Sequence, residues 1–234
     1  MDYQPRTIAY LCDLLHPPQA PEPRPIQKLH NRMFEGGAPT YATFAVTPLG
    51  PVLANPAERP GAASQAAFLG DRFQFREELG DMTIETFGER VRTVAGEAAG
   101  LRGIGHFTGQ QVTLRSLINP RHYSDSRAFL SEAVFGFGEE VEELGRAPQL
   151  YGLRLAFPPA KGEANALSLR LESYNADARS LFLEVQASFG PIPLPGGVST
   201  AALEPIERNV QTTYAFLTDR VLPFVARFDA RQPS

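Results

Sequence analysis

The chain has 234 residues, 43% of them hydrophobic, and its 22 Lys and Arg residues against 26 Asp and Glu give a net charge of −4. This length is enough for one large domain or two fused small ones, and the mild acidity argues against a duplex-DNA partner, which needs a wide basic footprint. The single cysteine, Cys12, excludes an internal disulfide framework and a cysteine-built metal centre.

Nothing in the sequence points to export or to a membrane. No segment approaches the roughly 20 apolar residues of a membrane span. The first ten residues include Asp2 and lack an apolar run, so we expect no signal peptide. The prediction is a cytoplasmic globular protein without a membrane partner.

In the first half of the chain, alternating apolar residues predict strands and three-to-four spacing predicts helices. The predicted elements are a strand over 6–15, a short helix starting at Pro25, three or four strands between 41 and 77, and a helix capped by Asp81 and ended by Gly100.

The second half repeats this order. The predicted elements are a strand over 111–119, a helix capped by Ser124 or Asp125 and continuing less regularly to Leu144, strands over 153–157, 167–171 and 181–189, and a long helix over 203–228. Pro223 is expected to kink or shorten the end of the last helix, because proline lacks the N–H that a helix interior needs.

The order β-α-β-β-β-α therefore occurs twice, which is typical of an internal duplication. We predict an α+β fold in which residues 1–234 form a single compact domain of two pseudo-repeats, about 6–102 and 104–230. Half a sheet with an exposed apolar face is unstable alone, so the halves should share one continuous, mainly antiparallel sheet. Helices would cover one face and leave the other open.

Three short motifs resemble a sporadically distributed bacterial family of about this length. They are 68–73 (Phe-Leu-Gly-Asp-Arg-Phe), 112–119 (Val-Thr-Leu-Arg-Ser-Leu-Ile-Asn) and 217–220 (Leu-Thr-Asp-Arg). The resemblance extends over nearly the whole chain as an order of elements and implies no established activity and no site residues. The element order is also similar to that of duplicated TATA-binding-protein-like saddles, a likeness that concerns fold and not function.

The sequence contains no recognisable catalytic or cofactor motif. Gly103-Ile104-Gly105 lacks the third glycine and the following helix of a dinucleotide fingerprint, and no phosphate-binding loop or metal-ligand spacing occurs. We therefore predict no cofactor, no metal site and no catalytic set. One alternative is an enzyme. His16 and His122 follow equivalent strands and could come close, and either could act as the base of a hydrolase or isomerase in a cleft between the halves.

Five arginines occupy strand positions that alternate with apolar residues. They are Arg72, Arg76, Arg115, Arg154 and Arg170. On the open face of the sheet, they could bind an anionic ligand or single-stranded nucleic acid, because the guanidinium group suits carboxylate and phosphate. The simpler interpretation is a polar sheet face on which the arginines pair across strands with Glu172 and Glu184, because cross-strand charge pairs are ordinary.

A second candidate surface is apolar. The proline-rich loop 190–197 carries Ile192 and Leu194, and Phe216 falls off the apolar stripe of the last helix. A rigid apolar loop beside an exposed aromatic ring is typical of a protein interface. The leading prediction is accordingly a non-enzymatic binding or assembly module that contacts another protein or itself, with the arginine face and the histidine enzyme as alternatives.

Overall fold

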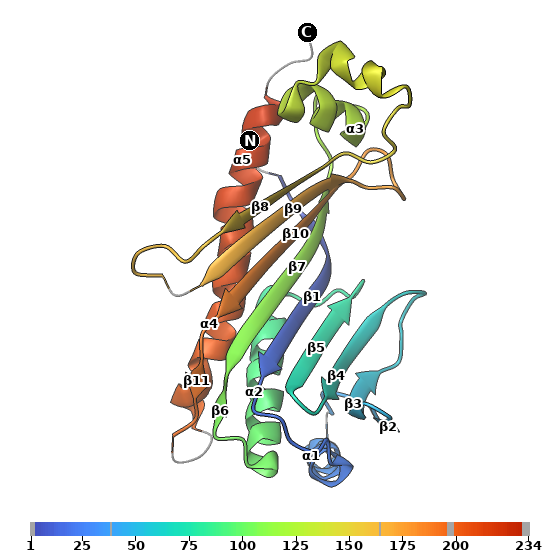
Figure 1. Cartoon of the computed structure of the whole chain (residues 1–234). Coiled ribbons are helices and arrows are strands. Elements are labelled where there is room, and N and C mark those ends of the chain that lie inside the picture. The colour runs from blue at the N-terminus through green and yellow to red at the C-terminus, as the bar shows by residue number, and fades with distance from the viewer. Residues whose placement is uncertain (1–2, 38, 164, 196–198, 231–234) are drawn as a thin grey trace.

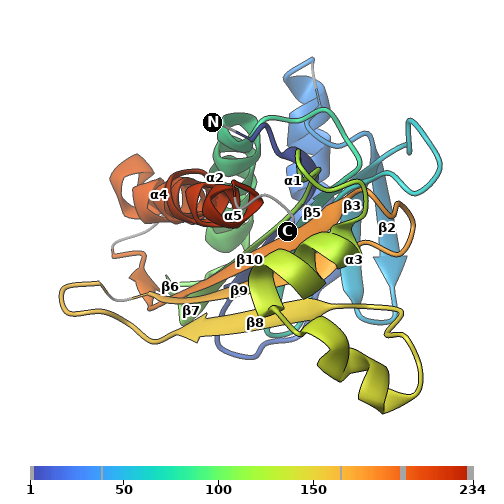
Figure 2. The same ribbon diagram turned by 90° about the horizontal axis from the view of Figure 1, so that it is seen from above.

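A nine-stranded antiparallel sheet carries helices on one face in the computed structural model, which describes residues 3–37, 39–163, 165–195 and 199–230 (Figures 1 and 2). The strand order is β2-β3-β4-β5-β1-β7-β10-β9-β8, with β1 and β7 at the centre. The predicted α+β class is confirmed. The two halves of the chain follow similar element orders, but an origin by duplication stays a prediction.

The elements of the first half agree with the predicted order. They are β1 (Arg6–Leu15), α1 (Pro23–Glu35), β2 (Thr43–Thr47), β3 (Gly50–Asn55), β4 (Ala63–Phe68), β5 (Arg72–Glu78) and α2 (Ile84–Arg102). The N-cap of α2 is Thr83, whose side chain accepts a hydrogen bond from the Thr86 N–H, so the predicted cap at Asp81 is wrong by two residues.

The second half follows the same order, with one irregular region. Its elements are β6 (His106–Phe107), β7 (Gly109–Ile118), α3 (Ser126–Ala128), η1 (Phe129–Phe135), η2 (Gly138–Leu144), β8 (Gly152–Phe157), β9 (Ala166–Ser173), β10 (Leu181–Phe189), β11 (Ile192–Pro193), α4 (Thr200–Phe216), η3 (Leu217–Val221) and α5 (Leu222–Asp229). Asp125 caps α3, as predicted, but the chain then continues as a π-helical and a 3₁₀ segment instead of one long helix.

The C-terminal helix continues through Pro223 by changing its winding. A proline ring clashes with the carbonyl four residues earlier, here that of Asp219. Just before the proline, the helix widens into the π-helical segment η3, in which the N–H of Leu222 reaches the carbonyl of Leu217. Regular helix then continues as α5 to Asp229, so Pro223 neither ends nor shortens it.

Alternation along the strands separates two faces. On β1, Tyr10, Cys12 and Leu14 are buried towards the helices, whereas Asp13 between them is only half-buried and points to the opposite face. We call these the helix face and the open face of the sheet. The helix face supports two apolar clusters, one under α2 and α4 and the other under η1, η3 and α5.

Burial makes Cys12 chemically inert. The side chain is 0% exposed, and removal from water raises the pKa of the Cys12 thiol to about 12. We expect iodoacetamide to leave this thiol unmodified in the folded protein at mildly alkaline pH and to alkylate it stoichiometrically in guanidinium chloride, as measured by intact mass. Rapid labelling without denaturant would contradict the burial.

Candidate functional site

The five predicted arginines lie on one face of the sheet. In an antiparallel pair, residues directly opposite each other share a face. Arg115 lies opposite Glu184, Glu184 opposite Arg170, and Arg170 opposite Arg154. The remaining two, Arg72 and Arg76, lie opposite open-face residues of β1.

Carboxylates neutralise most of this arginine row. Arg115 Nε lies 2.7 Å from Glu184 Oε2, and Arg170 Nε lies 2.5 Å from Glu172 Oε1. The other close pairs are Arg72–Asp71 at 2.8 Å and Arg76–Glu78 at 2.5 Å. A face with alternating charges attracts an anion far less than five unpaired arginines would, so this geometry favours neutralisation by carboxylates. Of the two predicted acids, only Glu184 makes a cross-strand pair, with Arg115; Glu172 pairs with Arg170 of its own strand, β9.

The apolar loop before the last helix is not an exposed surface. Ile192 and Leu194 are each 3% exposed, because β11 pairs with β6 and turns both side chains into the first apolar cluster. Phe216 is half-buried, and its ring lies 5.7 Å from that of Phe157 on β8. The predicted interface at Ile192 and Leu194 is therefore wrong; Gly196 and Gly197 of the loop lie outside the described residues.

The two histidines do not meet. His16 follows β1 at the end where Leu15 lies opposite Gly109, whereas His122 follows β7 at its other end, beyond Ile118. A ten-residue strand separates these ends by about 30 Å. The expectation that the histidines come close is therefore wrong.

Each histidine makes contacts that are explained by the packing of the fold. His16 is 3% exposed, packs against the ring of Phe73, and has a lowered pKa because burial disfavours its charged form. His122 Nδ1 lies 2.7 Å from the backbone carbonyl of Asp229, at the C-terminus of α5.

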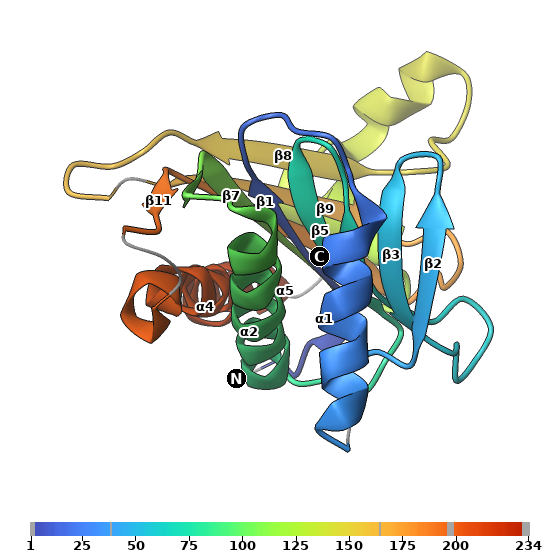
Figure 3. The same cartoon turned by 90° about the horizontal axis from the view of Figure 1, so that it is seen from below.

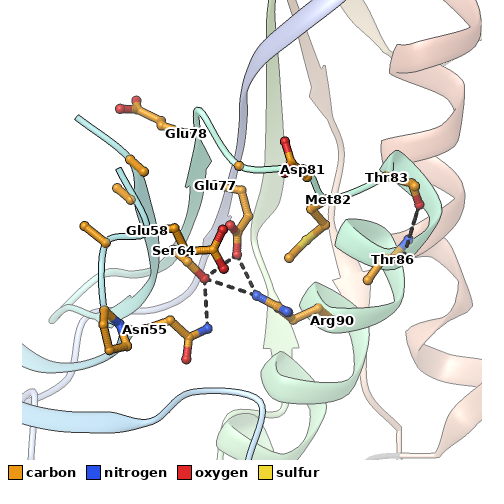
Figure 4. Close-up of a pocket in the computed structure, with 15 residues that line it drawn as sticks. Asn55, Glu58, Ser64, Glu77, Glu78, Asp81, Met82, Thr83, Thr86 and Arg90 are labelled. Atoms are coloured by element: carbon orange, nitrogen blue, oxygen red, sulfur yellow. Dashed lines mark hydrogen bonds and ion pairs between the residues drawn. The ribbon is translucent and has the colours of Figure 1, made fainter. Parts of the chain in front are cut away.

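A polar pocket of about 390 Å³ opens between the ends of β3, β4 and β5 and the first turns of α2 (Figure 4). At its floor, Glu77 Oε1 accepts hydrogen bonds from Ser64 Oγ at 2.5 Å and from Arg90 Nη1 at 2.6 Å. Ser64 Oγ accepts in turn from Arg90 Nη1 at 3.2 Å and from Asn55 Nδ2 at 3.1 Å.

This network ties three strands to a helix. Asn55, Ser64 and Glu77 are directly opposite one another across β3, β4 and β5, and Arg90 covers them from α2. Burial raises the pKa of Glu77, and the hydrogen bond from Ser64 and the ion pair with Arg90 offset part of that increase. Because the serine oxygen already makes three hydrogen bonds, we assign the network a structural role.

The edge strand β2 and the segments beside it carry exposed apolar side chains. This strand forms one edge of the sheet, beside α1 and with β3 as its neighbour in the sheet (Figure 3). Val46 is 61% exposed, and Leu49 in the following turn is 72% exposed. Phe34, at the end of α1, is 49% exposed, and His30 contacts the rings of both Phe34 and Phe44. These four apolar residues, Phe34, Phe44, Val46 and Leu49, form what we call the β2 patch.

Unused backbone groups lie along the same edge. In an antiparallel ladder, a hydrogen-bonded pair exchanges two N–H···O bonds. Val46 lies opposite Pro51, which has no N–H, so this must be a non-hydrogen-bonded pair. The N–H and C=O of Val46 therefore point away from β3, and alternation gives Phe44 the same direction.

The other edge of the sheet is better protected. Its strand, β8, carries Arg154, and Phe157 at its end packs against Phe216. Natural proteins commonly block edge strands with charges, prolines or bulges. The segment Thr43–Thr47 contains no charge and no proline, and its pairing with β3 proceeds without a register shift.

Sequence reasoning identified this strand but not its position. Alternation in 41–46 predicts a half-buried strand, and only the strand order places it at an edge. No charged residue occurs from Ala38 to Asn55, and this composition does not distinguish an edge from an interior strand, because edges are commonly marked by charges.

No group of three or more His, Cys, Asp or Glu side chains among the described residues is arranged to hold a metal ion. Among the helices of the same residues, none has the length and apolar character needed to cross a bilayer. Comparison of the chain with protein-family models, with curated proteins and with solved structures found no match. The resemblance of its three short motifs to a bacterial family thus stays a prediction.

Proposed function

We propose that this chain is a protein-binding module that receives an extended strand of its partner at the β2 edge. The observation that carries the proposal is an edge strand without charges whose outward N–H and C=O groups, at Phe44 and Val46, have no neighbouring strand in the part of the chain that the structure describes. Such a row of backbone groups is a template for strand addition.

The energetics favour an added strand. Each new backbone hydrogen bond contributes about 0.5–1.5 kcal/mol net. The exposed side chain of Val46, and that of Leu49 in the following turn, would lose contact with water when a partner strand and its neighbouring residues cover the β2 patch. Backbone bonds would supply general affinity, and the patch would supply selectivity for apolar side chains.

The alternative on the open face has weaker support. Four of the five arginines there are paired with carboxylates, so an incoming anion would have to displace Glu or Asp side chains.

Replacing Val46 by proline is expected to abolish partner binding without unfolding the protein. The Val46 N–H faces outward, so proline removes no bond to β3, and proline is tolerated at such edge positions. The matched control is Val46→Thr, which keeps the N–H and the β-branched shape. The measurement is co-purification from native lysate with mass spectrometry of the bound protein.

Two results together would support the proposal. Val46→Pro should lose the bound protein while Val46→Thr retains it, and binding of that protein should slow hydrogen exchange at the N–H groups of Phe44 and Val46. Equal capture by both variants, with no change in exchange along β2, would contradict strand addition. A thermal melt of each variant checks that the fold is intact.

A further inference from the structure

The sequence of β2 is nearly symmetric about its middle residue. It reads Thr43-Phe44-Ala45-Val46-Thr47. When two copies of such a strand pair antiparallel about Ala45, Thr43 of one copy lies opposite Thr47 of the other, and Phe44 lies opposite Val46. We infer that the partner strand is β2 of a second copy of this chain. This inference rests on the proposed function of the β2 edge.

The backbone directions fit this register. Phe44 and Val46 point their N–H and C=O groups outward, so each can exchange two hydrogen bonds with the other in the second copy. Ala45 then lies on the two-fold axis, opposite itself, as a non-hydrogen-bonded pair. A shift by one residue would place outward groups against inward ones and lose these bonds.

The side chains agree with the same pairing. Phe44 lies opposite the buried Leu53 of β3, so Phe44 and Val46 are both on the helix face. In the dimer they form aromatic–β-branched pairs, and Thr43 and Thr47 form threonine pairs on the open face; both kinds of pair stabilise antiparallel strands. Since the strand carries no charge, its copies meet without repulsion there, although the chain has a net charge of −4.

The symmetry closes the assembly. A two-fold axis normal to the sheet at Ala45 joins two nine-stranded sheets edge to edge and keeps both helix layers on the same side. The contact uses one edge of each copy and leaves no second β2 edge exposed, so it gives a dimer and not a fibre. It also covers the β2 patch, including Val46 at 61% exposure.

Cysteine cross-linking tests the register directly. Non-hydrogen-bonded pairs have Cα atoms about 4.5 Å apart, which lies within the range for a disulfide. Under mild oxidation, Ala45→Cys should give a covalent dimer, and native Cys12 should not compete because it is 0% exposed. Thr43→Cys alone should stay monomeric in denaturing electrophoresis, whereas the double variant Thr43→Cys/Thr47→Cys should cross-link. Ala156→Cys, on the opposite edge strand β8, is the matched control and should not cross-link.

Light scattering on the purified chain tests the dimer itself. The wild type and Val46→Thr should have twice the monomer mass of 25.6 kDa, and Val46→Pro should have the monomer mass. Two results together would overturn the inference. The wild type would be monomeric at every concentration up to near-millimolar, and Ala45→Cys would cross-link no faster than Ala156→Cys. If the wild type is monomeric but binds another protein, and Val46→Pro loses that protein, then the second-copy inference fails and the proposal of strand addition stands. If Val46→Pro changes neither mass nor binding, both fail.

Discussion

Replacing Arg90 by methionine is expected to lower the free energy of unfolding by about 3–5 kcal/mol, because it leaves the buried carboxylate of Glu77 without its positive partner. The two side chains are only 19% and 6% exposed, and their atoms lie 2.6 Å apart at the floor of the pocket in Figure 4. Methionine preserves much of the packing of the arginine stem over β4 and β5. The measurement is urea unfolding followed by circular dichroism.

A matched control separates burial from charge. Arg72 also pairs with a carboxylate, that of Asp71 at 2.8 Å, but these side chains are 36% and 52% exposed. Arg72→Met should therefore cost less than about 1 kcal/mol, as solvent-screened pairs do. Similar losses for Arg72→Met and Arg90→Met would contradict the claim that desolvation of Glu77 makes the difference.

The loss in Arg90→Met should also depend on pH. The pKa of Glu77 is already raised by burial, and removal of Arg90 raises it further. An acid with a raised pKa binds more protons when folded than when unfolded, so the unfolding free energy of the variant falls as pH rises through that window. The deficit relative to wild type should be smaller at mildly acidic pH than at neutral pH. A deficit that grows on acidification would contradict this assignment.

Replacing Asp229 by alanine is expected to cost about 2–4 kcal/mol of unfolding free energy, because several donors would lose their acceptor. The Asp229 carboxylate is buried and accepts hydrogen bonds from Tyr3 Oη and from the backbone N–H groups of Arg121 and His122. It therefore joins the N-terminal segment, the turn after β7 and the end of α5. Thermal unfolding would measure the loss.

Asp219 provides the control for this prediction. It lies in η3, in the same C-terminal helix; it is exposed, and its carboxylate accepts a hydrogen bond from the hydroxyl of the neighbouring Thr218 at 2.8 Å. Asp219→Ala should change stability by no more than about 0.5 kcal/mol. Equal effects at Asp219 and Asp229 would show that the loss reflects charge alone and not the three donors.

The pKa of Asp229 is shifted in the opposite direction from that of Glu77. Burial alone would raise the pKa of Asp229, but the hydrogen bonds from Tyr3 and the two N–H groups hold it below its ordinary value. Its stabilising contribution is present above the ordinary carboxyl pKa of about 3.9 and is lost as pH falls through the folded-state value. The gap between wild type and Asp229→Ala should therefore narrow on acidification.

Much of the secondary structure followed from local patterns. Period-two alternation located β1 at its observed bounds and β7 within two residues, because strand faces are set by neighbouring residues in sequence. The same alternation placed all five arginines on one face. Where local signals conflicted, prediction failed: 129–144 has the glycines and the partial apolar spacing of a weak helix, and it winds as π-helical and 3₁₀ segments.

The candidate site was less accessible from the sequence. Arg115 and Glu184 are 69 residues apart in the chain, so their pairing depends on the register of β7 against β10. Ile192 and Leu194 have the composition of an exposed apolar loop, and only the pairing of β11 with β6 turns them inward. Periodicity reports which side of a strand is apolar, but not which other strand lies beside it.

The sequence by itself determined most of the helices and strands and the polar side of those strands, since these depend on residues that are close together in the chain. Tertiary structure alone decided that β2 lies at an edge with the N–H and C=O groups of Phe44 and Val46 directed away from β3, because strand order arises from contacts between distant segments. An edge and an interior strand of the same composition look alike until their neighbours are known.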